Sequence, residues 1–390
     1  MRDVRNSPGQ QGSGGYIAVL TDFFEPAVRA GGPVRSLAAL TKSGIGSRVK
    51  VLTRDRDVGE KVPMSGVVPD VWVSHGNGEV MYFGGAGIPG VWRAWRTLWK
   101  FDPSHIYINS LFAVATGMVP LALAKLGLLP KARIVLAPRG QLDPGALSLR
   151  ANKKQVALRI LLGSGMLRSV RWHATSELEA RHIRRVVGAA AEVCVALPLP
   201  TVPGPPAVHQ RPSRPLRLIF ISRISPKKGL HTLLEALKYV VAPVHLDVYG
   251  PSDDEGYGAK CHALAGALPE HHRVEFHGVV SHDRVNTLLR VSDAFVLPTH
   301  GENFGHAIYE ALAASCPVVL TPTTPWTAAV AAGAGWLVEP DDVSGLAVLL
   351  EGLAVGSPED FEARSASALA CALAYYAEAE AENGWRRLFA

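Results

Sequence analysis

Cysteine is scarce in this sequence, and the four residues present stand far apart. Cys194, Cys261, Cys316 and Cys371 form no Cys-x-x-Cys pair and share no zinc-module spacing with a histidine. The pattern argues against a zinc-binding module or a disulfide framework, and we expect reduced thiols in a cytosolic protein.

Long apolar runs are also missing. Residues 1–15 are polar and glycine-rich and lack the apolar core of a secretory signal, so we interpret them as a loose tail and do not expect export. The longest apolar stretch, 111–129, is broken by Gly117, Pro120 and Lys125. Because its unbroken part is shorter than the roughly 20 residues that span a bilayer, we interpret it as a buried helix.

Acidic residues are few in the first 200 positions, which hold 26 Lys and Arg against 13 Asp and Glu. The formal net charge is therefore +13 in this part and −7 in the remainder. A basic half favours a phosphate-bearing partner, nucleic acid or an anionic membrane surface, unless it is an ordinary solvated face. Because no nucleic-acid module is recognisable, we expect no nucleic-acid partner.

The length of 390 residues suits two domains, and 48% hydrophobic with 19% charged residues is typical of an ordered protein. Strands and helices alternate on both sides of a proline-rich stretch, 198–215, which we interpret as an interdomain linker. The predicted strands are 16–20, 49–53, 105–108, 133–137, 172–175, 216–221, 245–249, 274–277, 294–297 and 317–320. The predicted helices are 34–40, 230–240, 259–267, one after Ser281 and one at about 305–314. This pattern predicts two α/β domains that face each other across a cleft, with ligands at the carboxyl ends of the strands.

The segment 298–311 contains two glutamates with seven residues between them. Glu302 lies in the loop after a predicted strand, and Glu310 lies within the following helix. Backbone amides near the start of that helix can receive a phosphate, and Gly305 allows its close approach. Glu310, two turns on, is suited to accept hydrogen bonds from ribose hydroxyls. Two glutamates chosen at random would more often be ordinary surface carboxylates.

A cationic loop, 222–229, also follows a strand and precedes a helix. Arg223 and a lysine, Lys227 or Lys228, can neutralise a diphosphate, both in a bound nucleotide and as charge develops on a leaving group. By itself a basic loop is more often merely solvated, and only one of the two lysines needs to point inward.

Together these motifs resemble the retaining glycosyltransferases of family 4, which have the GT-B architecture. Glu302 and Glu310 fit the E-x7-E motif of that family, and Arg223 with Lys228-Gly229 fits its R-x4-K-G motif. The similarity extends over nearly the whole chain, since two further segments look like the glycine loop and the end of the first domain in that family. These segments are Gly31-Gly32, and His173 to Ser176 with Glu179.

The resemblance implies two Rossmann-like domains, at 1–198 for the acceptor and 199–371 for the sugar donor, with a C-terminal helix at about 372–390 that packs back on the first. It implies that Arg223 and Lys228 bind the diphosphate, Glu310 the ribose, and Glu302 with the following backbone the transferred sugar. The predicted donor site comprises Gly31, Gly32, Arg223, Lys228, Glu302, Asn303, Phe304, Gly305, His306 and Glu310. Of these, Glu302, Lys228 and Arg223 are the catalytic candidates.

The chain departs from the family pattern at Asn109, where many relatives carry a histidine after a strand of the first domain. Asn109 cannot titrate near neutral pH, so a proton-handling role at this position is in doubt. His105 is more consistent with a structural role. The predicted acceptor-binding residues are Arg139, in another strand-end loop, with Asn109 and His173. Arg139 lies in a loop that a simple turn built on prolines and glycines explains equally well.

No Asp-x-Asp motif stands where a metal could hold a diphosphate, since Asp253 and Asp254 are adjacent in a Gly/Ser-rich loop. We therefore expect no metal and no cofactor, and expect the leaving group's charge to be balanced by Arg223, Lys228 and the helix N-terminus.

The segment 91–100 contains Trp92, Trp95 and Trp99 on one helical face, with cations between them. This composition is typical of a helix that lies in a membrane interface. Tryptophans at this spacing more often face a protein core, so both interpretations stay open.

We expect a retaining, metal-independent glycosyltransferase that moves a hexose-type sugar from a UDP or GDP sugar to an acceptor hydroxyl. The expected acceptor is a lipid-linked saccharide of bacterial exopolysaccharide, O-antigen or capsule synthesis, with the protein in the cytoplasm or on the inner face of the plasma membrane. Two alternatives stay open, a sugar-nucleotide epimerase or hydrolase of the same fold and a non-catalytic polysaccharide-assembly protein. The intact pair Glu302 and Glu310 argues against the second alternative.

Overall fold

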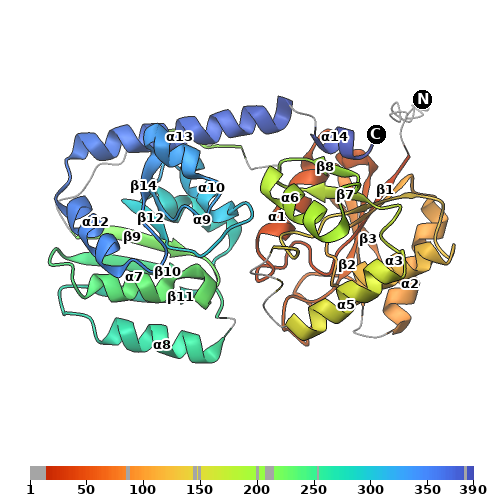
Figure 1. Ribbon diagram of the computed structural model, residues 1–390, viewed down its shortest axis with the longest axis horizontal. Helices are drawn as coiled ribbons and strands as arrows, with labels where there is room; N and C mark the ends of the chain where they lie inside the picture. Colours follow the sequence, from red (N-terminus) through yellow and green to blue (C-terminus); the bar gives the residue numbers. More distant parts are fainter. Residues whose placement is uncertain are drawn as a thin grey trace, which may run out of the picture. The chain divides into compact units, whose positions relative to one another are not determined.

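The chain divides into two compact units. The structure is a computed structural model that describes residues 15–84, 88–143, 147, 151–198, 202–206, 215–252, 254–381 and 384–390. Unit 1 consists of Met1–Ala27, Pro33–Leu197 and Gly384–Ala390, and unit 2 of Val28–Gly32 and Pro198–Asn383 (Figure 1). Most of the predicted linker, the N-terminal tail up to residue 14, and Asp253 lie outside the described residues.

Unit 1 is built on an eight-stranded sheet in the order β3-β4-β2-β1-β5-β6-β7-β8. All neighbouring pairs are parallel except β3 with β4. Every residue of the central strands β1 and β5 is buried, as expected of parallel strands covered on both faces. The strands are β1 (Ile17–Leu20), β2 (Val49–Arg54), β3 (Trp72–His75), β4 (Gly78–Phe83), β5 (His105–Ile108), β6 (Arg133–Leu136), β7 (Arg171–Ala174) and β8 (Val193–Val195). The α-helices are α1 (Gly32–Lys42), α2 (Ile88–Phe101), α3 (Val119–Lys125), α5 (Ala151–Gly163), α6 (Glu177–Val187) and α14 (Gly384–Leu388).

Unit 2 is built on a parallel six-stranded sheet in the order β11-β10-β9-β12-β13-β14. The order places β9 in the middle, where its carboxyl end lies beside that of β12, the position at which open α/β sheets bind ligands. The strands are β9 (Leu216–Ile221), β10 (Val244–Tyr249), β11 (Arg273–Gly278), β12 (Ala294–Leu297), β13 (Val318–Leu320) and β14 (Gly335–Leu337). The main helices are α7 (Leu230–Leu237), α8 (Glu255–Gly266), α9 (His282–Arg290), α10 (His306–Ala313), α12 (Val343–Val355) and α13 (Pro358–Ala381). Helix α7 contacts α8 and α12, whereas α10 contacts α9 and α13 (Figure 1).

All ten predicted strands are present, with ends that differ by a residue or two, but four further strands were not predicted. Strands β3 and β4 form an antiparallel hairpin around Gly76-Asn77, a turn signal that would have identified it. Strands β8 and β14 have three residues each, too few for a recognisable pattern. The interpretation of 111–129 as a buried helix is only partly correct, because a π-helical turn precedes α3, and Val114 and Leu126 are exposed.

The last two helices divide between the units. Helix α13 groups with unit 2, and α14 with unit 1. Trp385 on α14 donates from Nε1 to the carbonyl oxygen of Leu197 at 2.9 Å and packs against the rings of Tyr107 and His173. The C-terminal turn thereby completes the core of unit 1 next to β5 and β7.

Gly229 allows the loops after β9 and β12 to touch. Its φ is +71°, and a Cβ at this position would lie 2.0 Å from the carbonyl oxygen of Pro298. Both the left-handed backbone and the close approach require glycine. The contact continues in a hydrogen bond from the backbone nitrogen of His300 to the oxygen of Lys227, 2.8 Å long.

Gly229→Ala should lower the free energy of unfolding by about 2 kcal/mol or more, because alanine is strained at this φ and its Cβ displaces Pro298. Urea unfolding followed by tryptophan fluorescence measures the change. Gly352→Ala is the matched control, since Gly352 lies exposed within α12 with no atom within 4 Å of its added Cβ. The control should be neutral or stabilising, and equal unfolding midpoints for the two variants would contradict the explanation.

Candidate functional site

Backbone and hydroxyl hydrogen bonds fasten the loop after β9 to the loop after β12. The oxygen of Lys227 accepts hydrogen bonds from the backbone of His300 and from Thr299 Oγ1, at 2.8 and 3.0 Å. The oxygen of Thr299 in turn accepts from Thr321 Oγ1 and Thr323 Oγ1, at 2.6 and 2.8 Å. Three successive strand ends therefore hold the side chains of 223–228 and 300–305 in fixed positions.

An ion pair between Lys228 Nζ and Glu302 Oε1 joins the two predicted motifs. Both side chains are largely buried, with 11% and 13% of their surface exposed. Burial lowers the pKa of Lys228, the Glu302 carboxylate opposes this, and the charges of Arg223 and Lys227 lower the pKa further. Lys227 and Arg223 are exposed. Lys228 is therefore the inward lysine of the cationic loop, and Arg223 lies close enough for its charge to act on the ammonium group.

Helix α10 begins directly after this ion pair. Gly305 precedes the helix with φ +78° and provides no side chain to cap it, while its carbonyl oxygen accepts hydrogen bonds from the backbone nitrogens of Ile308 and Tyr309 at 2.9 and 3.1 Å. Phe304 is fixed by a hydrogen bond from Trp326 Nε1 to its carbonyl oxygen, 2.5 Å long, and by rings of Trp326 and Tyr375 at centroid distances of 5.4 Å. The aromatic packing holds the helix entry in place.

Glu310 lies in the middle of α10 and is 8% exposed. Its Oε1 lies 3.5 Å from Nδ1 of His282, the first residue of α9. His282 was not predicted as a site residue. The only signal in the sequence was Ser281 as a helix start, which does not indicate which helix lies beside α10.

The predicted acceptor residues of unit 1 form one buried network with Tyr107. Arg139 donates from Nε to Asn109 Oδ1 at 2.7 Å and from Nη2 to the Tyr107 hydroxyl at 2.8 Å. That hydroxyl lies 2.7 Å from His173 Nδ1, and His173 Nε2 lies 2.9 Å from the oxygen of Ala196. Because a carbonyl only accepts, Nε2 carries the proton, so Nδ1 accepts from Tyr107. Tyr107 thus links Arg139 to His173 through its hydroxyl group, a role that was not predicted.

Glu179 fixes the loop that carries Arg139. Its carboxylate accepts from the backbone nitrogen of Gly140 at 2.6 Å and from the backbone and hydroxyl of Thr175 at 2.8 and 2.6 Å. Arg139 itself has φ +54°, a strained value for a non-glycine residue. The strain and the buried carboxylate together hold the guanidinium at the carboxyl end of β6.

The predicted donor residues from Arg223 to Glu310 come together in unit 2, at β9, β12 and α10. Gly31, with φ +71°, and Gly32, the first residue of α1, belong to the short segment Val28–Gly32 that groups with unit 2. Among the acceptor residues, His173 is completely buried. Its ring accepts from the Tyr107 hydroxyl, which in turn accepts from Arg139. Ligand binding by all of these residues stays a prediction.

The two units define the GT-B class of folds. Sucrose-phosphate synthase of Thermosynechococcus elongatus superimposes with a TM-score of 0.75 over 96% of this chain and 99% of that chain, at 21% identity. HepE of Anabaena, solved in complex with UDP-glucose, superimposes with a TM-score of 0.69 over 94% and 99% of the two chains, at 20% identity. The predicted α/β fold class with GT-B architecture is confirmed.

Residues 206–359 match the model of the family Glycosyl transferases group 1. The matched range contains both predicted motifs. Phosphatidyl-myo-inositol mannosyltransferase of Mycolicibacterium smegmatis is 29% identical over 187 residues, which are 46% of this chain and 47% of the relative. The chain spans about half the length of the curated relatives it matches.

His173 should make unit 1 sensitive to acid. Burial and the charge of Arg139 lower the pKa of His173 to about 3, whereas the unfolded value is near 6.5. The unfolded chain therefore binds a proton that the folded chain lacks, so the stability contributed by neutral His173 is complete above pH 6.5 and is lost as the pH falls towards 3. From pH 7 to pH 5 this group should lower the free energy of unfolding by about 2 kcal/mol.

Urea unfolding at both pH values tests this, with His173→Gln expected to lose about 2 kcal/mol less than the unchanged protein on acidification. His271→Gln, an exposed histidine of unit 2, is the control and should behave as the unchanged protein. An identical pH dependence in the His173 variant would contradict the assignment of a neutral imidazole.

Proposed function

We propose that the protein is a retaining, metal-independent glycosyltransferase of family 4 that uses a nucleotide diphosphate sugar. The observation that carries the proposal is the meeting of three features at the carboxyl ends of β9 and β12. These are the largely buried pair of Lys228 and Glu302, the N-terminus of α10, and the buried carboxylate of Glu310 within that helix. A cation, a helix N-terminus and a deeper acid suit a diphosphate and its pentose.

In this proposal the diphosphate lies between Arg223, Lys228 and the first amides of α10. The donor's ribose hydroxyls donate to Glu310, and Glu302 accepts from hydroxyls of the transferred sugar. When the diphosphate takes over the ammonium group of Lys228, the carboxylate of Glu302 becomes available to the sugar. Glu310 has His282 beside it, so the ribose site is bounded by α9 as well as α10.

During transfer, the acceptor oxygen forms a bond to the anomeric carbon while the bond from that carbon to the diphosphate breaks on the same face. The acceptor's proton passes to the departing diphosphate oxygen, and Arg223 and Lys228 balance the charge that develops there. The polar residues of unit 1 support this route. Neutral, fully buried His173 and amide Asn109, which is bonded to Arg139, are unsuited to act as a general base.

The donor is a UDP or GDP hexose, and the acceptor is a lipid-linked saccharide or phospholipid in polysaccharide or glycolipid synthesis at the cytoplasmic face of a membrane. HepE was solved with UDP-glucose, and the mannosyltransferase relative is named for a phosphatidylinositol acceptor. Arg139, held by Asn109, Tyr107 and the Glu179 loop, offers a fixed guanidinium for an anionic acceptor group.

Lys228→Ala and Glu310→Ala should each lower kcat/KM at least about a hundredfold, because each removes a group that holds the leaving nucleotide. A thermal-shift screen with UDP, GDP and ADP sugars first identifies the donor, since a ligand of the folded state raises the melting temperature. Sugar transfer is then measured with that donor. Lys227→Ala is the matched control, because Lys227 is exposed in the same loop, and should change the rate less than about threefold.

Near-normal turnover in either the Lys228 or the Glu310 variant would contradict the assignment of the donor site. Isomerised or hydrolysed sugar in the absence of acceptor would instead favour a sugar-nucleotide epimerase or hydrolase. Binding of donor without any turnover would favour the non-catalytic assembly role.

We also propose that α2 of unit 1 lies on an anionic membrane. Trp92 and Trp99 are each 57% exposed, whereas Leu98 is completely buried and Trp95 is half-buried. The helix thus keeps one side in the core and presents two tryptophans outward with exposed cations nearby, as an interfacial helix does. Among the described residues, no helix has the length and apolarity needed to cross a bilayer.

Flotation with vesicles tests the membrane contact. The protein should float with vesicles that contain anionic lipid at about 50 mM salt and be released at about 500 mM, because salt screens the attraction. The double variant Trp92→Ser with Trp99→Ser should reduce flotation at least about fivefold, since it removes apolar area from the interface. Tyr239→Ser, at a 71% exposed aromatic of unit 2, is the control. Absence of flotation at low salt would contradict the proposed contact between α2 and an anionic membrane.

A further inference from the structure

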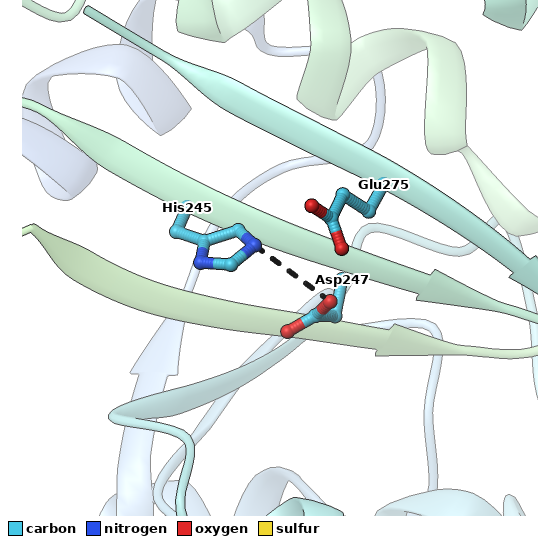
Figure 2. Close-up of side chains that lie close together, drawn as sticks. All are labelled: His245, Asp247 and Glu275. Atoms are coloured by element: carbon cyan, nitrogen blue, oxygen red, sulfur yellow. Dashed lines mark ion pairs between the residues drawn. The ribbon is translucent and has the colours of Figure 1, made fainter.

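One imidazole and two carboxylates converge on adjacent strands at the edge of the unit 2 sheet. His245 and Asp247 lie two residues apart on β10, so they share one face of the sheet. Glu275 on β11 is the register partner of Asp247. One ligand atom from each of the three lies within 4.8 Å of the others, and Figure 2 shows the side chains projecting on the same side of the two strands.

His245 has a nitrogen that no described residue satisfies. Its Nε2 is shielded from solvent and makes no hydrogen bond within the described part of the chain. It points towards Asp247, but Oδ1 lies 3.8 Å away, which is too far for a hydrogen bond (Figure 2). A buried imidazole nitrogen that has no hydrogen-bond partner and points towards carboxylates has the position of a metal ligand.

A second histidine stands at the same place. His277 Nε2 lies 2.5 Å from Asp247 Oδ1 and 3.7 Å from Glu275 Oε2. Its ring stacks on Tyr249 with a centroid distance of 4.5 Å and an interplanar angle of 15°, which fixes its orientation. The other carboxylate oxygen of Glu275 is engaged by the exposed Arg273, and this contact lowers the pKa of Glu275. Oε2 of Glu275 therefore remains on the side of the histidines.

We propose that His245, Asp247, Glu275 and His277 bind a divalent transition-metal ion of the zinc class that joins β10 to the edge strand β11. Two imidazoles and two carboxylates suit tetrahedral Zn²⁺ better than Mg²⁺ or Ca²⁺, which prefer oxygen ligands alone. Ligand atoms about 2.1 Å from a tetrahedral ion lie roughly 3.4 Å apart. The ligand atoms of His245, Asp247 and Glu275, which lie within 4.8 Å of one another, therefore have to approach by up to about 1.4 Å, which side-chain rotations of partly exposed residues can supply. Metal binding replaces the contact of His277 Nε2 with Asp247 by a bond to the ion, and the neutral imidazole then carries its proton on Nδ1.

The site is separate from the proposed donor site. His245 and Asp247 lie within the body of β10, whereas Arg223, Lys228 and Glu302 follow the carboxyl ends of β9 and β12. The ion is therefore a structural link between two strands, and the metal independence proposed for sugar transfer is unaffected. An edge strand held by a metal link resists opening, because the ion binds the folded arrangement and not the separated strands.

Isothermal titration with ZnCl₂ tests the site, using the full chain without a histidine tag after treatment with EDTA. One zinc ion per chain with micromolar or tighter affinity is expected at pH 7.5, with no heat from MgCl₂ at the same concentrations. His245→Ala and Glu275→Gln should each weaken zinc binding at least about thirtyfold. Glu275→Gln keeps the shape of a partly exposed side chain, so it retains the fold if His245→Ala does not.

His271→Ala is the matched control, because this exposed histidine precedes β11 and lies outside the cluster. It should bind zinc as the unchanged protein does. Less than about 0.2 zinc per chain, or equal affinity in the cluster variants and the control, would overturn the proposal. Donor binding measured by thermal shift should be the same with and without zinc, and its loss on EDTA treatment would overturn the separation of the two sites.

Discussion

The candidate site of unit 2 depends on one largely buried ion pair, Lys228 with Glu302. Removing two charges from water costs free energy that their attraction only partly returns, so such a pair is a weak reason for a stable fold. A multivalent anion changes this balance, because it interacts with the ammonium group more strongly than one carboxylate does. The lowered pKa of Lys228 has the same origin, since burial and neighbouring cations disfavour its charge until an anion arrives.

The two units handle polar groups in opposite ways. Unit 2 brings charged groups to the ends of its strands, where Arg223 and Lys227 are exposed and Lys228 is buried. Unit 1 contains a hydrogen-bond network with fixed donors and acceptors, which runs from Arg139 through Tyr107 to the neutral, buried His173. Such a network positions a guanidinium and does not exchange protons near neutral pH. This division of roles is consistent with the proposed reaction, in which the departing diphosphate and not a side chain of unit 1 takes the acceptor's proton.

Alternation of apolar strands and helices was enough to predict the two α/β units and ten of the strands. Burial on both faces makes such strands continuous apolar runs, as in Ile17–Leu20, and these are visible without knowledge of their neighbours. The missed strands are a hairpin, of which only the edge strand β3 has exposed residues, and two strands of three residues, Val193–Val195 and Gly335–Leu337. These short segments form strands because they pair with a neighbouring strand, and a local sequence pattern does not show which strand will lie beside them.

The same limit separates the parts of the site that were predicted from those that were missed. Glu302 and Glu310 have seven residues between them along one loop and helix, so their spacing alone suggests a ligand. His282, Tyr107 and the cluster around His245 depend on contacts between different elements, and two residues on one strand carry no signal until the register of the next strand is known. Pairing Asp247 with Glu275 places like charges side by side, which is destabilising unless a cation lies between or beside them. The sheet therefore creates, from residues 28 positions apart, a demand for positive charge that Arg273 meets at one oxygen of Glu275.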